Sequence, residues 1–297
     1  MKFAFIQGMD KDERRKPRQE RIPVTLVCEV LEVSRAGYYA WKKRPAAPRV
    51  DADAELTELI KKLHEEHEGR LGIDRMVSEL AKGGHAHSPK RVRRLARAAG
   101  LTCVHPKPYK TTTIRDGAGG GGLVDLVERA FVPNGPDQLW FTDITYIRTW
   151  AGWAYLATIM DGFSRMVVGW AVARHMRTEL VTDALVMAIN RRRPPIGQTV
   201  VHSDRGCQYT SHEFRELALA NGIIPSVGHT GICFDNAMAE SFNATIKKEL
   251  IHQHAWPTFD LVKHAVFEYI EVYYNRKRPH TRIGGLSPEE FEFVTAA

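Results

Sequence analysis

The sequence predicts an α/β fold in residues 135–297, where three antiparallel strands precede alternating helices and strands, with an all-α region before it. Two observations predict this division. Before residue 107, apolar residues recur at helical spacing and the helices end at glycines. After a glycine-rich stretch at 117–122, the pattern changes to short β-rich runs joined by turns. We therefore expect a helical region and a mixed α/β region joined by a linker.

The composition describes a globular protein with no expected membrane-spanning segment. The 297 residues are 43% apolar, which is ordinary for such a protein, and the length allows two domains. No apolar run reaches the roughly 18 residues that a membrane helix requires. Four scattered cysteines without a C-x-x-C pair predict reduced thiols in the cytoplasm: Cys28, Cys103, Cys207 and Cys233.

The net charge of +7 is unevenly distributed along the chain. Residues 1–122 contain 25 Lys and Arg against 16 Asp and Glu, a net of +9. Residues 123–297 contain 17 against 19, a net of −2. A basic first half beside a near-neutral second half suggests that the first half holds a polyanion on which the second half works. A basic solvated surface would give the same charge, so charge alone leaves both interpretations open.

Residues 1–50 are expected to form a basic N-terminal helical segment. Val24, Val27 and Leu31 follow helical spacing, and SRAG at 34–37 interrupts the pattern before a second apolar stretch. This arrangement resembles half of a small helix–turn–helix.

Residues 51–106 are expected to form a helix–turn–helix DNA-binding domain. Leucines and isoleucine at helical spacing indicate the first helix, and GRLG at 69–72 interrupts it. A second helix ends at glycines 83–84. Ser88 and Pro89 are typical of an N-cap followed by proline at the first helical position, so a third helix begins here.

The third helix, at 90–99, is predicted to be the recognition helix. Val92, Leu95 and Ala96 would face the core of the domain. Its outer face carries four arginines: Arg91, Arg93, Arg94 and Arg97. A short basic helix after a tight turn has the shape that enters the major groove of DNA. A solvated basic helix in an all-α subdomain is the alternative interpretation.

A linker is predicted at 107–134, because the hydrophobic period is lost between residues 111 and 122, a stretch that ends in GAGGGG. The domain at 135–297, which includes a C-terminal helical extension, begins with three strands joined by short turns, an antiparallel meander: 139–148, 154–160 and 166–172. Helices and strands then alternate: 178–192, 199–203, 211–221, 223–226 and 235–251. This is the element order of an RNase H-like fold.

Three carboxylates are the candidate catalytic and metal-binding residues. Asp143 lies within an apolar strand, where a buried carboxylate is costly unless it is paired or bound to a metal. Asp204 directly follows a buried strand, the position at which α/β folds bind ligands, although turn chemistry would explain it as well. Glu240 lies on a helix whose residues Met238 and Phe242 face inward, together with Ile246 and Leu250.

On that helix, Glu240 shares a separate face with Asn243, Ala244 and Lys247. Lys247 is therefore placed to hold the DNA strand on which the carboxylates act. A solvated Glu–Lys pair is the alternative interpretation for this face taken alone. Three crowded carboxylates repel one another, and Mg²⁺ or Mn²⁺ would relieve that repulsion, because hard cations prefer oxygen ligands. Two such ions about 3.5–4 Å apart would act on a phosphodiester.

Four segments resemble the catalytic core of bacterial insertion-sequence transposases, members of the retroviral integrase superfamily: WFTDITYI at 140–147, DGFSRMVVGW at 161–170, HSDRGCQYTS at 202–211 and DNAMAESF at 235–242. The ending resembles the same group at 274–280 (YNRKRPH) and 286–291 (LSPEEF). The likeness is strongest to the catalytic protein that the second of two overlapping reading frames encodes.

The resemblance implies an RNase H-like catalytic core in which Asp143, Asp204 and Glu240 bind two Mg²⁺ ions and Lys247 contacts the terminal DNA of the element. The implied reaction is strand cleavage that exposes a 3′-hydroxyl, followed by attack of that hydroxyl on another phosphodiester. Implied partners are double-stranded DNA at the element ends and at the target, further copies of the chain on that DNA, and a companion first-frame segment, all at the bacterial nucleoid.

Two other functions share part of this pattern. A nuclease on the same fold would use the carboxylates but would not need the arginine-rich helix. A DNA-binding remnant of a transposase would not need the three carboxylates intact. We therefore expect a transposase.

Overall fold

The computed structural model describes residues 2–13, 15–43, 48–104, 125–127, 133–228 and 236–296. The chain divides into two compact units, Met1–Leu59 and Ile60–Ala297. The predicted linker at 107–134 lies largely outside the described residues. No helix among the described residues is long and apolar enough to cross a membrane.

The described residues of the first unit include the short helices α1 (Lys2–Glu13), α2 (Val24–Val30) and α3 (Arg35–Lys43). The break between α2 and α3 falls before Arg35, so most of the SRAG stretch begins a helix instead of interrupting one. The helices enclose a small core that the fully buried Tyr38 dominates, together with Ile6, Val27 and Cys28.

The helix–turn–helix region has three helices, as predicted: α4 (Pro48–Glu66), α5 (Ile73–Lys82) and α6 (Pro89–Ala98). The Ser88 hydroxyl accepts a hydrogen bond from the Arg91 backbone N–H, which caps α6, and Pro89 occupies its first position. The apolar side of α6 is buried as expected, at Val92, Leu95 and Ala96.

The second unit contains a five-stranded sheet of order β3-β2-β1-β4-β5. Its strands are β1 (Leu139–Thr149), β2 (Gly152–Asp161), β3 (Val167–Ala173), β4 (Thr199–Ser203) and β5 (Ile223–Val227). The first three strands form the predicted antiparallel meander, whereas β4 pairs parallel to both β1 and β5. The carboxyl end of β4 therefore lies beside the middle of β1.

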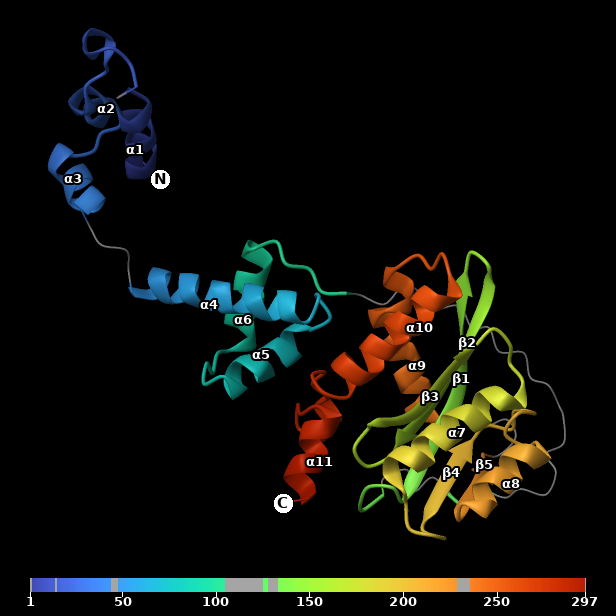
Figure 1. Cartoon of the computed structure of the whole chain (residues 1–297). Coiled ribbons are helices and arrows are strands. Elements are labelled where there is room, and N and C mark those ends of the chain that lie inside the picture. The colour runs from blue at the N-terminus through green and yellow to red at the C-terminus, as the bar shows by residue number, and fades with distance from the viewer. Residues whose placement is uncertain are drawn as a thin grey trace. The chain divides into compact units, whose positions relative to one another are not determined.

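Helices cover both faces of this sheet (Figure 1). On one face, α7 (Thr178–Arg192) and α8 (His212–Ala220) pack on a core around Trp140 and Ile159. A Cβ at Gly169 on β3 would overlap the Ala184 carbonyl oxygen, so glycine allows α7 to approach this strand closely. On the other face, α9 (Ala237–Glu249) and the helices after it pack on a core around Phe141.

The C-terminal extension consists of α10 (Phe259–Phe267), which continues into a π-helix (Glu268–Tyr274), and α11 (Pro288–Ala296). Glu249, at the end of α9, anchors this region. It accepts hydrogen bonds from Arg278 at 2.7 and 2.8 Å and from the Tyr269 hydroxyl at 2.9 Å.

Candidate active site

Strand register places Asp143 and Asp204 at equivalent positions. The parallel ladder of β1 and β4 pairs Leu139 with Val200 and Phe141 with His202. Continued one pleat further, the same register sets Asp143 opposite Asp204, which comes directly after the last residue of β4. Since side chains alternate between the faces of a strand, Asp143 lies on the same face as Phe141, the face that α9 covers.

The Asp143 carboxylate is held by two hydrogen bonds. Its Oδ1 accepts from the Ile144 backbone N–H at 2.8 Å, and its Oδ2 accepts from Asn243 Nδ2 on α9 at 2.8 Å. Glu240 precedes Asn243 by three residues, so both side chains project from one side of α9. The helix therefore brings a third carboxylate towards the two aspartates.

The three carboxylates interact electrostatically. Burial raises the pKa of Asp143 to about 7, and the charges of Asp204 and Glu240 contribute to the increase. Burial and the charge of Asp204 also raise the pKa of Glu240, although this side chain is exposed. Such mutual repulsion is expected where acidic groups gather without a cation.

The donor chemistry of the site suits a hard cation. The side-chain oxygens of Asn236 and Asn243 are buried there, and neither has a hydrogen-bond partner among the described residues. Asn236 donates to the Thr142 carbonyl oxygen at 2.9 Å, so its amide is fixed beside β1. Carboxylate and amide oxygens are the ligands that Mg²⁺ accepts. In the described part of the chain, however, no three His, Cys, Asp or Glu side chains are close enough to share one metal ion.

The Asp204 side chain is exposed at the carboxyl end of β4, where a tight turn orients it. Its Oδ1 accepts a hydrogen bond from the Gly206 backbone N–H at 3.0 Å. Arg205 donates to the Gly228 carbonyl oxygen at 2.8 Å and ties this turn to the end of β5. Asp204 therefore stabilises the turn through one oxygen, and this role is compatible with ligand binding.

Lys247 lies on the carboxylate side of α9, two turns after Glu240. Its ammonium group sits 5.0 Å from the centre of the Tyr146 ring, over an exposed part of β1. Lys247 and Tyr146 thus form a cation–π pair between α9 and β1. The sequence pattern assigned a role to neither Asn243 nor Tyr146, although the three-residue spacing from Glu240 could have singled out Asn243.

The arginines of α6 lie away from its buried side. Arg93, Arg94 and Arg97 are exposed, and Arg91 is half-buried next to the capped first turn. The helix therefore combines an apolar inner side with a basic outer side, as a recognition helix does.

Comparison with known families gives matches to two kinds of domain. A model described as "Integrase core domain" matches residues 133–233, and a second model of that description matches residues 221–288. A model described as "HTH-like domain" matches residues 51–109. The chain thus combines an integrase core with a helix–turn–helix region. The integrase-core match and the mixed sheet confirm the predicted RNase H-like fold class.

Full-length relatives define the family. The chain is 34% identical over 297 residues to the transposase InsF for insertion sequence IS3A of Escherichia coli, covering 98% of both chains. It is 36% identical over 265 residues to the "Insertion element IS600 uncharacterized 31 kDa protein" of Shigella sonnei, covering 89% of this chain and 97% of the relative. The chain therefore belongs to the insertion-sequence transposases, a family of DNA-integrating polynucleotidyl transferases.

Solved structures that align with the chain include viral integrases. A chain of the simian T-cell lymphotropic virus intasome in complex with the PP2A regulatory subunit B56 gamma aligns with a TM-score of 0.44 and 17% identity, covering 78% of this chain and 74% of that one. The catalytic core domain of HTLV-2 integrase in complex with magnesium aligns with a TM-score of 0.41 and 19% identity, covering 53% and 97%.

Proposed function

We propose that Asp143, Asp204 and Glu240 bind two Mg²⁺ ions, for which Mn²⁺ substitutes, and that strand cleavage and strand transfer occur at this site. The parallel register of β1 and β4 carries the proposal, because its continuation sets Asp204 opposite Asp143. The pKa of Asp143, which burial raises and the charges of Asp204 and Glu240 raise further, also supports it, since a bound cation would favour the ionised carboxylate. The bound ions would stabilise charge on the attacking and leaving oxygens of the phosphodiester.

The chain's own residues have separate tasks in this proposal. Asn243 orients Asp143 through the 2.8 Å hydrogen bond, as outer ligands orient carboxylates in metal sites. Lys247 contacts a phosphate of the terminal DNA strand, and the Tyr146 ring keeps its side chain directed along the sheet. Glu240 supplies the third carboxylate from α9, the helix that covers this face of the sheet.

Recognition of the element is assigned to α6. We propose that its arginines contact the terminal repeats of the element: Arg91, Arg93, Arg94 and Arg97. Their position on the outer side of a capped helix supports this role.

The proposal also covers the domain boundaries, the partners of the chain and the place of the reaction. We propose a basic helical segment at 1–50, a DNA-binding domain at 51–106, a linker at 107–134 and a catalytic core at 135–297. Transposition joins two element ends to a target, so several copies of the chain would assemble on double-stranded DNA, together with a companion first-frame segment. The reaction would take place at the bacterial nucleoid.

A metal-binding measurement tests the proposed site. Mn²⁺ is titrated into the protein bound to DNA that carries the element ends, and bound ions are counted by electron paramagnetic resonance. We expect about two ions in the wild type and fewer in Asp204→Asn. The exposed Asp183→Asn on α7 is the matched control and should resemble the wild type. Unchanged Mn²⁺ binding in Asp204→Asn would remove this aspartate from the site.

A further inference from the structure

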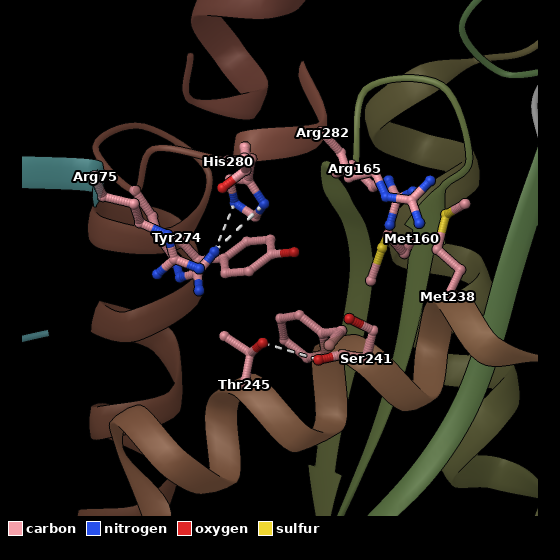
Figure 2. Close-up of a pocket in the computed structure, with 12 residues that line it drawn as sticks. Arg75, Met160, Arg165, Met238, Ser241, Thr245, Tyr274, His280 and Arg282 are labelled. Carbon is pink, nitrogen blue, oxygen red and sulfur yellow. Dashed lines mark hydrogen bonds between the residues drawn. The ribbon is translucent and has the colours of Figure 1, made fainter. Parts of the chain in front are cut away.

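A cavity of about 140 Å³ lies in the second unit, beside α9, the β2–β3 turn and the segment after the π-helix. Its walls carry four arginines: Arg75, Arg165, Arg278 and Arg282. Figure 2 shows Arg165 and Arg282 side by side on one side of the cavity, with the Tyr274 hydroxyl directed towards them from the other. This concentration of positive charge suits an anion.

Among the described residues, two of these four arginines have a carboxylate partner. Arg278 forms an ion pair with Glu249 at 2.7 Å, and Arg75 approaches the same carboxylate at 3.6 Å. Within the described part of the chain, neither Arg165 nor Arg282 forms an ion pair or a side-chain hydrogen bond. Arg165 is half-buried at this position, so its charge is neither paired with a carboxylate nor fully hydrated.

The pKa values of His280 and Arg165, which line the cavity, are consistent with an anion-binding site. Burial and the charges of Arg278, Arg75 and Arg165 lower the pKa of His280 to about 2, so its imidazole is neutral. Burial also lowers the pKa of Arg165, and the charge of Arg282 acts in the same direction, although Tyr274 opposes it. An anion placed between the two guanidinium groups would relieve this repulsion.

We propose that this cavity binds a phosphate of the DNA backbone between the guanidinium groups of Arg165 and Arg282. The Ser241 hydroxyl lines the same cavity and is available as a donor, whereas Thr245 already donates to the Ser241 carbonyl oxygen at 2.8 Å. Paired guanidinium groups and a hydroxyl are the donors that phosphates accept.

The phosphate in this cavity is different from the one that is cleaved. Ser241 and Thr245 lie four residues apart and share one side of α9, whereas Glu240 and Asn243 project from another. The helix thus separates the cavity from the carboxylates. The inference rests on the proposed function in that it takes DNA as the substrate, and it adds a second place where that DNA is held.

Salt-dependent DNA binding tests this site without requiring catalysis. Binding of the full chain to labelled duplex DNA is measured by fluorescence anisotropy in EDTA, between about 50 and 200 mM NaCl. For the double variant Arg165→Gln/Arg282→Gln, we expect roughly tenfold weaker binding and a salt slope smaller by about 1. The Arg165→Lys/Arg282→Lys variant keeps the charge and should retain most of the slope.

Arg193→Gln provides the matched control, because Arg193 is exposed at the far end of α7. A slope in the double glutamine variant equal to that of the wild type would overturn the proposal. A second arm compares thermal unfolding in inorganic phosphate with unfolding in chloride at equal ionic strength. Stabilisation by phosphate that the double variant loses, without any change in DNA binding, would identify a site for free anions and would also overturn the proposal.

Failure of the carboxylate assignment would be distinguishable from failure of this one. The binding measurement is made in EDTA and requires no DNA cleavage, so its outcome does not depend on the metal ligands. A changed slope in the arginine variant therefore supports the cavity even if the metal site is wrong.

Discussion

At the residue scale, the carboxylates proposed to bind metal are expected to lower the stability of the metal-free protein. Asp143 is held between a strand and a helix, where burial raises its pKa to about 7 and the charges of Asp204 and Glu240 contribute to the increase. Because the pKa of Asp143 is higher in the folded than in the unfolded chain, the folded chain is more stable when this carboxyl is protonated than when it is ionised. Its stabilising effect is present below the unfolded-state pKa and is lost as the pH rises through about 7. Without a cation, the ionised site therefore weakens the fold at neutral and alkaline pH.

Replacing Asp143 by asparagine should stabilise the metal-free protein while abolishing strand cleavage. At pH 8 in EDTA we expect a gain on the order of 1–2 kcal/mol in the free energy of unfolding, since a buried charge that other carboxylates repel is removed. Asn243 can turn its amide, whose oxygen has no partner in the described part of the chain, to accept from the new side chain. Denaturant unfolding measures the change.

The control for that experiment is Asp183→Asn, which removes an exposed carboxylate from α7. It should change stability little in EDTA or in Mg²⁺. Added Mg²⁺ should stabilise the wild type but not Asp143→Asn. A lower stability of Asp143→Asn in EDTA would contradict the expectation that the ionised Asp143 weakens the metal-free fold.

Asn243→Ala tests the residue that orients Asp143. Loss of the 2.8 Å hydrogen bond should lower Mn²⁺ affinity or the cleavage rate about 10–100-fold and leave DNA binding unchanged. Asn221→Ala, at the end of α8, is the matched control. Equal loss of Mn²⁺ affinity and DNA binding in Asn243→Ala would indicate a general structural role.

At the scale of elements, the end of α9 and the π-helix form a buried ionic anchor. Glu249 is 2% exposed and Arg278 is 4% exposed, so neither charge reaches much water. Burial acts to raise the pKa of Glu249, but the hydrogen bonds and charge of Arg278 outweigh it and lower the pKa overall. The same segment contacts the helix–turn–helix region, where the Arg70 guanidinium stacks over the Tyr273 ring at 4.6 Å.

Glu249→Ala should lower the free energy of unfolding by about 3–5 kcal/mol, because it leaves the buried Arg278 charge unpaired. Glu289→Gln, which affects an exposed pair 3.7 Å from Arg276, should cost less than about 1 kcal/mol. Because the folded-state pKa of Glu249 is lowered, its contribution is fully present above the ordinary value of 4.5 and is lost as the pH falls through the folded-state pKa. Unfolding curves from pH 7 into acid should therefore converge for wild type and variant, and a constant difference would contradict this.

The proposed contact of α6 with DNA gives a further prediction at this scale. Arg93→Ala/Arg94→Ala should weaken DNA binding roughly tenfold and reduce the salt slope by about 1 for each arginine that pairs with a phosphate. Arg193→Ala removes a comparable exposed charge from α7 and should have a smaller effect. If both variants bound DNA equally well across the salt range, α6 would not be the recognition helix.

At the scale of the whole molecule, the order of elements was predictable because periodicity is a local property of the chain. The meander, the alternation after it and the capped α6 all follow from spacing within about 15 residues. The parallel register that sets Asp204 beside Asp143 depends on pairing between strands that are far apart in the chain, which no local pattern contains. The Glu249–Arg278 pair and the arginine cavity join segments from across the second unit, so they became visible only in the structure.

In the proposed mechanism, one group of three carboxylates performs both DNA cleavage and DNA joining. Strand transfer by the purified chain tests it most directly, with labelled DNA carrying the element's terminal repeats, Mg²⁺ against EDTA, and Asp204→Asn beside Asp183→Asn. We predict joined products that require Mg²⁺, persist in Asp183→Asn and disappear in Asp204→Asn. Joining by Asp204→Asn at the wild-type rate would show that Asp204 is not part of the active site.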